Sequence, residues 1–359
     1  MVFNFTDVRI TNEIIRSNFS EKDLNKTFSH LEVSYNNKTP RLCDYYITGS
    51  YGSYSSTNTL QSNTNCKVYL KKIIQSGIRA IHLDLYSNDN ESEVVVRGED
   101  EKDSGENFED VCSIISTYIE SDEVLSEYPF ILFLNLKYES LYYDLSNKIA
   151  NSLKKNFNDK FPDIRYNFNR YKIGREYITN FKNKVIILLN RYDNGDALNE
   201  LTHGIVYDEE SENNEHHITS VRFSTDNISS LNNVVNGKYN MDSRFSNKDK
   251  VIEKTKKDII IVYTDDDIYF NMDSSDDKSS KSYGINICMN KFKIKDGLKT
   301  VTLDYMSNFR DIDDNYQLFK LKPEEYMNED EPLTIEQVNP NKKLQTDLKL
   351  EKPLVFGNL

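Results

Sequence analysis

The sequence lacks the long apolar run that a membrane-spanning helix requires. Hydrophobic residues make up 37% of its 359 residues, and no stretch approaches roughly 18 consecutive apolar side chains. Residues 1–7 show no basic region followed by an apolar run, so no secretory signal is visible. We expect a soluble protein that is neither secreted nor anchored by a transmembrane segment.

Cysteine is scarce and nucleotide-binding motifs are missing. The four cysteines, Cys43, Cys66, Cys112 and Cys288, lie far apart and have neither metal-site spacing nor the density of a disulfide framework. We expect each to be a reduced, buried side chain. There is no Gly-x-Gly-x-x-Gly pattern and no phosphate-binding loop, so a nucleotide-binding sheet has no support.

Positive charge is in deficit. The 45 Lys and Arg residues face 58 Asp and Glu residues, which gives a net charge of −13. Because phosphate affinity comes from Lys and Arg, this argues against a nucleic-acid partner and, less strongly, against docking on anionic lipid. A local basic patch is compatible with an acidic total. The 24 Tyr and 18 Phe can build a core despite the shortage of aliphatic residues.

The first half of the chain alternates between strand and helix patterns. Residues 78–85 alternate with period two, which places His82 and Asp84 on one face. Continuous apolar runs at 128–134 and 184–190 indicate strands buried on both faces. Further strands are expected at 44–48 and 94–96, and helices at 67–76, 108–118 and 142–157. This order predicts a parallel α/β sheet, and a (β/α) barrel fits the length.

The second half has weaker patterns. Residues 190–217 are acidic and are expected to form a surface excursion, and 273–282 a charged loop. Strands are expected at 258–263, 283–290 and 316–322. A short helix is expected at 10–19, and residues from 328 onward read as an extended polar tail.

Four segments then carry a family resemblance. They are Gly-Ser-Tyr-Gly-Ser-Tyr at 49–54, Gly-Ile-Arg-Ala-Ile-His-Leu-Asp at 77–84, Val-Val-Arg-Gly at 95–98 and Tyr-Pro-Phe-Ile-Leu-Phe-Leu-Asn at 128–135. In order and interval they resemble the X region of phosphoinositide-specific phospholipase C. More weakly, 260–263, 283–290 and Phe-Lys-Leu-Lys-Pro at 319–323 resemble its Y region.

The resemblance implies a distorted TIM-like barrel with its site at the carboxyl ends of the strands. We expect an N-terminal extension at 1–40, a barrel at 41–327 and a tail at 328–359. Within the barrel, the X-like part is expected at about 41–190 and the Y-like part at about 218–327.

The family's site has two acid–base histidines and a Ca²⁺ ion held by Asn, Glu, Asp and Glu. Carried over to this chain, the histidine positions hold Tyr51 and Arg97, and the ligand positions hold Gly52, His82, Asp84 and Asn135. Leu188 and Asn190 stand near the places of its phosphate-binding lysines, and Ile261 near that of its Y-region arginine.

These replacements remove the chemistry that the family needs. Only Asp84 remains anionic, Gly52 has no side chain, and Ca²⁺ binds about six to eight oxygen ligands. Tyrosine, with a reference pKa of about 10, is a poor base at neutral pH. We therefore predict a pseudoenzyme with no catalytic residues, no metal and no cofactor.

His82, Asp84 and Arg97 allow two interpretations. One is a repurposed acid–base site with Arg97 as a phosphate clamp; the other, preferred, is a polar plug in which Arg97 forms an ion pair with Asp84. His216-His217 and the aspartates at 265–267, 273, 276 and 277 lack the spacing of metal sites, and we expect solvated loops.

Three functions remain open. The first is a structural or scaffolding protein, because the strand expected at 283–290 and the Asn-, Lys- and Ile-rich composition are similar to phospholipase-C-like proteins of large DNA viruses. It predicts a cytoplasmic or virion location with protein partners such as capsid proteins. The second is an inositol-phosphate or phosphoinositide binding module that uses Arg97 and Lys137. The third is a divergent phosphoric diester hydrolase that relies on His82, Asp84 and Arg97.

Overall fold

The structure is a computed structural model in which twelve segments of the chain are described. They are residues 27–52, 66–88, 92–97, 105–121, 123–138, 143–191, 195–208, 218–223, 248–264, 281–290, 306 and 308–329. The predicted helix at 10–19 and the tail beyond 329 lie outside these segments. None of the helices within them is long and apolar enough to cross a membrane.

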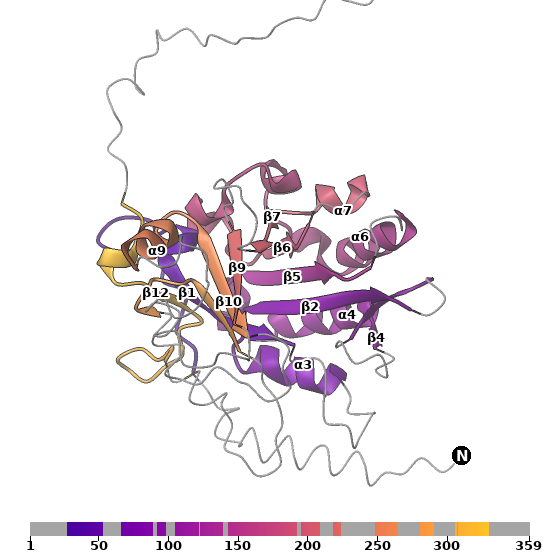
Figure 1. The fold of residues 1–359 in the computed structure, drawn as a ribbon. Coiled ribbons are helices and arrows are strands. Elements are labelled where there is room, and N and C mark those ends of the chain that lie inside the picture. The colour runs from indigo at the N-terminus through magenta and orange to yellow at the C-terminus, as the bar shows by residue number, and fades with distance from the viewer. Residues whose placement is uncertain are drawn as a thin grey trace, which may run out of the picture. The chain divides into compact units, whose positions relative to one another are not determined.

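Parallel strands form the centre of the fold (Figure 1). The strands are β1 (Tyr45–Tyr51), β2 (Ala80–Ser87), β3 (Val94–Val96), β4 (Glu106–Asn107), β5 (Phe130–Leu136), β6 (Val185–Leu189), β7 (Gly204–Ile205), β8 (Tyr207–Asp208), β9 (Ile218–Phe223), β10 (Ile259–Thr264), β11 (Ile287–Asn290) and β12 (Phe319–Leu321). The helices are α3 (Cys66–Gln75), α4 (Phe108–Ile119), α5 (Glu123–Glu127), α6 (Tyr143–Phe157), α7 (Asp196–Glu200) and α9 (Lys248–Thr255).

The sheet closes on itself through one short strand. Its order is β7-β6-β5-β2-β1-β11-β10-β9-β8, and every pairing along this path is parallel. Val206 alone separates β7 from β8, so residues 204–208 pair with β6 at their start and with β9 at their end. The ends of the path therefore meet in the same piece of chain. This confirms the predicted α/β class and the distorted TIM-like barrel.

His203 prepares this closure. Its Nδ1 accepts the backbone N–H of Ile187 at 3.0 Å, and its own backbone N–H donates to the Ile187 carbonyl at 2.9 Å. The ring thus replaces a main-chain acceptor beside β6. The next residue is Gly204. A Cβ at this position would lie 2.9 Å from Leu188 Cδ2 and closer still to Ile218 Cδ1. A larger residue at this point would require the side-chain ends of Ile218 and Leu188 to shift.

The predicted surface excursion at 190–217 is therefore wrong over its described part. Residues 201–206 are all buried, and α7 packs Leu198 into the core. The sequence pattern misleads because the strand is only five residues long and begins with Gly204, so no alternation is visible. β9 and α9 were not predicted either, whereas β5 and α6 lie within two residues of their predicted bounds.

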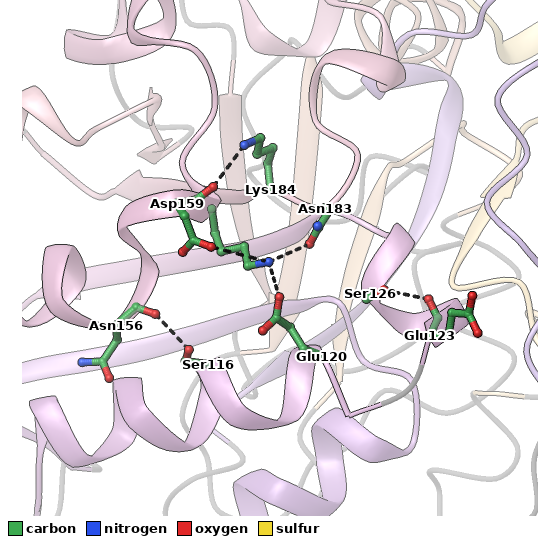
Figure 2. A network of polar contacts seen from close by, with 9 residues as sticks. Ser116, Glu120, Glu123, Ser126, Asn156, Asp159, Asn183 and Lys184 are labelled. Carbon is green, nitrogen blue, oxygen red and sulfur yellow. Dashed lines mark hydrogen bonds and ion pairs between the residues drawn. The ribbon is translucent and has the colours of Figure 1, made fainter.

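Polar contacts hold the outer helices against the start of β6 (Figure 2). Lys160 forms an ion pair with Glu120 at the end of α4 and reaches Asn183 at 3.4 Å. Ser116 donates to the Asn156 carbonyl of α6 at 2.8 Å, and Lys184 donates to the Asp159 carbonyl at 3.2 Å. These contacts fix α4 and α6 relative to each other, which in turn positions β5 and β6.

Candidate functional site

The predicted site positions gather at the carboxyl ends of β1, β2 and β5. Tyr51 pairs in register with His82, and His82 with Phe133. Two residues further along the same strands, Asp84 pairs with Asn135. Neighbouring residues in register point to the same face of a sheet, so these side chains form two successive layers at one end of the barrel.

The first layer is a stack of aromatic rings. The His82 ring lies 4.8 Å from that of Tyr51 and 4.7 Å from that of Phe133, measured between centroids. The Phe133 contact is edge-on, at 80° between ring planes. All three side chains are buried. Such contacts stabilise packing by about 0.5–1.5 kcal/mol each beyond the buried area. The first layer is therefore packed as a core is packed.

The second layer joins a carboxylate to an amide. Asn135 Nδ2 donates to Asp84 Oδ1 at 2.5 Å, and His82 Nε2 lies 4.0 Å from the same oxygen. Both Asp84 and Asn135 are buried. A second carboxylate at the Asn135 position would require a cation to hold it beside Asp84. An amide satisfies Asp84 directly, because its N–H group donates to the charged oxygen.

These residues do not fit the Ca²⁺ ion that the resemblance implies. The Asn135 amide turns an N–H group toward Asp84, whereas Ca²⁺ binds oxygen. His82 offers only nitrogen, and Gly52, in a left-handed backbone conformation at φ 56°, offers no side chain. Across the described segments, no three His, Cys, Asp or Glu side chains gather as a metal site would require.

Arg97 does not form the predicted ion pair with Asp84. Its guanidinium carbon lies 4.3 Å from the centroid of the Tyr86 ring, and only its backbone N–H reaches Asp84, at the carbonyl oxygen and 3.4 Å. Arg97 directly follows β3, which pairs antiparallel with β2, so Asp84 and Tyr86 of β2 are both neighbours of its side chain. The Tyr86 face provides a cation–π contact near the surface, where the guanidinium keeps its hydration.

At the rim between β5 and β6, the sequence had pointed to Asn190 and Lys137 but not to Tyr138 and Arg191. Asn190 Oδ1 accepts the Leu136 N–H at 2.9 Å, so its side chain extends the strand pairing beyond Leu189. Arg191 donates to the Tyr138 carbonyl and lies 5.9 Å above the Tyr138 ring. Lys137 is half-buried on the face that carries Asn135. Leu188 and Ile261 are buried core residues.

Several predicted features lie outside the described residues. These are His216-His217 and the aspartates at 265–267, 273, 276 and 277. Cys43, Cys112 and Cys288 are buried, as predicted, and burial raises the pKa of the Cys43 thiol to about 12. The side chain of Cys66 is not described.

The fold is a distorted TIM-like barrel, and these two layers lie at the carboxyl ends of its strands, where barrels of this class have their sites. Residues 38–190 match the family described as phosphatidylinositol-specific phospholipase C, X domain. The matched segment is less than half of the chain. It contains β1, β2, β5 and β6, and with them Tyr51, His82, Asp84 and Asn135.

Two solved structures with a TM-score above 0.5 show the same fold over more of the chain. PLC21 from L. pealei matches with a TM-score of 0.56 and 13% identity, over 82% of this chain and 38% of that one. PLC21 from S. officinalis matches with a TM-score of 0.56 and 13% identity, over 84% of this chain and 39% of that one. A calcium-dependent phosphoinositol-specific phospholipase C from Pseudomonas matches with a TM-score of 0.47 and 11% identity, over 72% of this chain and 92% of that one. The chain thus spans about two fifths of the PLC21 chains. No curated protein matches its sequence.

Proposed function

We propose that this chain is a phospholipase-C-type barrel that does not catalyse phosphodiester cleavage and acts as a structural protein. One observation carries the proposal. The positions that hold acid–base and metal-binding groups in the family are occupied by a packed Tyr51–His82–Phe133 stack and a satisfied Asp84–Asn135 pair.

The chemistry of these groups supports the proposal. A general base must reach a substrate proton, and the buried imidazole of His82 is covered on both sides by rings. Tyrosine has a reference pKa of about 10, so Tyr51 would be a weak base near neutral pH. Asp84 accepts from Asn135 and is the one carboxylate among the family's four ligand positions.

The test is a cleavage assay. Phosphatidylinositol in mixed vesicles is incubated with the full chain, with Ca²⁺ and with chelator, and release of inositol phosphate is measured. We expect no release above the protein-free rate in either condition. Turnover that disappears in both His82→Gln and Asp84→Asn would overturn the proposal. Turnover that survives both substitutions would point to a contaminating enzyme, which an independent preparation identifies.

Phosphodiester hydrolysis by a divergent site is the second candidate, and the family match favours it more directly. Residues 38–190 match a phospholipase C domain family, and His82 Nε2 lies 4.0 Å from Asp84 Oδ1. An aspartate can orient a histidine that acts as base. This candidate requires the His82 ring to leave its stack. It therefore predicts that Phe133→Ala, which opens one side of the ring, raises turnover.

A ligand-binding role for the barrel mouth also remains a prediction. Arg97 and Lys137 are half-buried cations on the rim and could face a phosphate. Titration calorimetry with inositol phosphates tests it. A heat of binding that is lost in Arg97→Gln would support this role. If no inositol phosphate gives a heat of binding, the role is excluded.

The scaffolding role in a virus particle rests on the composition and the closing-strand motif at 283–290. It predicts recovery in fixed stoichiometry within a large particle when the protein is captured from its native source. Recovery as a free monomer would contradict this role.

A further inference from the structure

The exposed apolar side chains of the described residues are concentrated in two places. Five large apolar residues are exposed, and four of them, Ile164, Phe168, Tyr171 and Tyr177, come from the segment 164–177 between α6 and β6. The fifth, Ile312, is 100% exposed and lies in the turn before β12. Single exposed apolar residues are common, but four in one short segment are not.

The first place is a basic-aromatic patch, which we define as Ile164, Phe168, Tyr171, Tyr177, Arg170 and Lys172. The buried Tyr166 supports it from below: its ring meets that of Tyr171 edge-on at 5.7 Å. The Tyr166 hydroxyl donates to Glu176 Oε2 at 2.8 Å. Arg170 lies 4.9 Å above the Phe168 ring, and Arg41 lies 5.1 Å above that of Tyr177. The patch is therefore built on a fixed support.

The backbone holds Phe168 outward in an unfavourable conformation. Phe168 and Asn169 have φ of 59° and 52°, in the left-handed region that bulky residues rarely adopt. The Asn169 N–H donates to the Thr202 carbonyl at 2.9 Å, which holds this conformation in place. Strain of this kind costs on the order of 1–3 kcal/mol and often marks functional surfaces.

The charge of the patch is opposite to that of the whole chain. Segment 164–177 contains Arg165, Arg170, Lys172 and Arg175 against Glu176 alone, hence a net charge of +3 in a chain of net −13. Neither Arg170 nor Lys172 forms an ion pair with a described carboxylate. The segment has three arginines to one lysine, whereas the chain has 12 Arg and 33 Lys. Arg and Tyr together are typical of protein interfaces, where Lys is depleted.

The second place is an acidic knob, residues 311–314, with the sequence Asp-Ile-Asp-Asp. Asp311 Oδ1 accepts the N–H groups of Asp313 and Asn315 at 2.9 and 2.8 Å, and its Oδ2 accepts from Ser29 Oγ at 2.5 Å. The turn is thus held rigid while the Ile312 side chain stands in solvent. Asp313 is exposed, and Asp314 pairs with Arg310 at 2.5 Å.

The two places are complementary: one is basic and exposes aromatic rings, and the other is acidic and exposes an aliphatic tip. Both are held in one conformation before any contact, which lowers the entropy cost of binding. We propose that the acidic knob of one copy of this chain docks on the basic-aromatic patch of a second copy.

Both surfaces lie at the end of the barrel where the strands begin. The knob is tied to Ser29, whose carbonyl accepts from Tyr128 just before β5. The patch precedes β6, and Arg41 links it to the start of β1. Because the pairing joins unlike surfaces, it yields either a two-fold dimer that makes it twice or a head-to-tail array. Either way the carboxyl ends of the strands stay uncovered, so the inference does not depend on whether the barrel cleaves phosphodiesters.

Sedimentation velocity of the full chain over a concentration series tests the proposal. The patch variant is Arg170→Glu with Lys172→Glu, and the knob variant is Ile312→Ser with Asp313→Lys, which leaves Asp311 intact. Lys148→Glu with Lys155→Glu on the exposed face of α6 is the charge-matched control. We expect concentration-dependent association of the wild type and of the control. Each test variant should associate at least about thirtyfold more weakly, as loss of an interface hot spot does.

Mixing the two test variants gives the sharpest result. Each lacks one of the two surfaces, so neither pairs with itself, but the knob of the patch variant fits the patch of the knob variant. We expect the mixture to form a 1:1 dimer and nothing larger. A wild type that stays monomeric, or a mixture that stays monomeric, overturns the proposal. So does patch-dependent binding of a monomeric chain to vesicles of phosphatidylserine and phosphatidylcholine, which would assign the patch to lipid.

Discussion

The two ends of the barrel satisfy their buried polar groups in different ways. Where the strands begin, buried side chains bond to the backbone: Asp44 accepts the N–H groups of Arg41 and Asn328 at 2.6 and 2.7 Å, and Lys322 donates to the Thr255 carbonyl at 3.0 Å. Where the strands end, Asp84 bonds to the side chain of Asn135. The first end therefore ties buried side chains to the backbone, whereas the second pairs two side chains at positions that resemble the family's metal-ligand positions.

Asn286 connects several backbone segments at the end of the barrel where the strands begin. Its amide donates to the Cys43 carbonyl at 2.8 Å, and its oxygen accepts the Ile260 N–H at 3.1 Å. The same amide lies 3.4 Å from the Tyr45 carbonyl, so this side chain, just before β11, contacts the starts of β1 and β10. Losing a buried partner of a backbone N–H costs about 1–3 kcal/mol, while a side-chain pair can be replaced as a unit at little cost. Substitutions at the two ends should differ accordingly.

The largest expected effect concerns His203. Burial lowers the pKa of its imidazole to about 3. The unfolded chain binds this proton below about pH 6.5, and the folded protein only near its lowered pKa. The contribution of His203 to the free energy of unfolding is therefore fully present above about pH 6.5. It falls as the pH drops toward 3, by up to about 5 kcal/mol.

Urea unfolding between pH 7 and pH 4 measures this loss. His203→Asn provides an acceptor for the Ile187 N–H without a titrating group, so its stability should vary less with pH than that of the wild type. An unchanged pH dependence in this variant would assign the loss to other groups.

The matched substitutions Asp44→Asn and Asp84→Asn compare the two ends directly. Asp44 uses both oxygens to accept backbone N–H groups, and an amide can accept only one of them. We expect Asp44→Asn to lower the free energy of unfolding by about 2 kcal/mol. In Asp84→Asn the facing amides can still bond, so the change should stay below about 1 kcal/mol. Equal losses in urea unfolding would remove the distinction between the two ends.

The smallest expected effect is a gain in stability. Phe168→Gly removes a left-handed phenylalanine, and glycine adopts this conformation without a Cβ penalty. The thermal midpoint should rise, in keeping with a stabilisation of about 1 kcal/mol, while self-association weakens. Tyr171→Ala serves as the control, since it should weaken association without raising the midpoint. A lower midpoint for Phe168→Gly would show that the ring supports the fold.

The sequence predicted the elements that have a clear period. The apolar run of β5, the alternation of β2 and the helical spacing of α6 were readable, because burial imposes those patterns on the residues. The closing strand at 204–208 was not, since it is short and makes two residue pairs with each neighbour. α9 is too polar for a clear apolar face.

The sequence predicted where the candidate site lies, but only some of the contacts that its side chains make. The family resemblance identified Tyr51, His82, Asp84 and Asn135, and strand register brings them together. That Asn135 would satisfy Asp84, and that Arg97 would stack on Tyr86, depends on tertiary packing and on a choice between two neighbours on one face. Sequence spacing contains no information on such a choice.

We propose that the carboxyl ends of the strands do not hold the cation that the family's chemistry requires. Titration calorimetry of Ca²⁺ into the full chain and into Asp84→Asn tests it most directly. We predict that the two isotherms coincide, because Asp84 is already satisfied by Asn135. Stoichiometric Ca²⁺ binding by the wild type that Asp84→Asn abolishes would contradict the account.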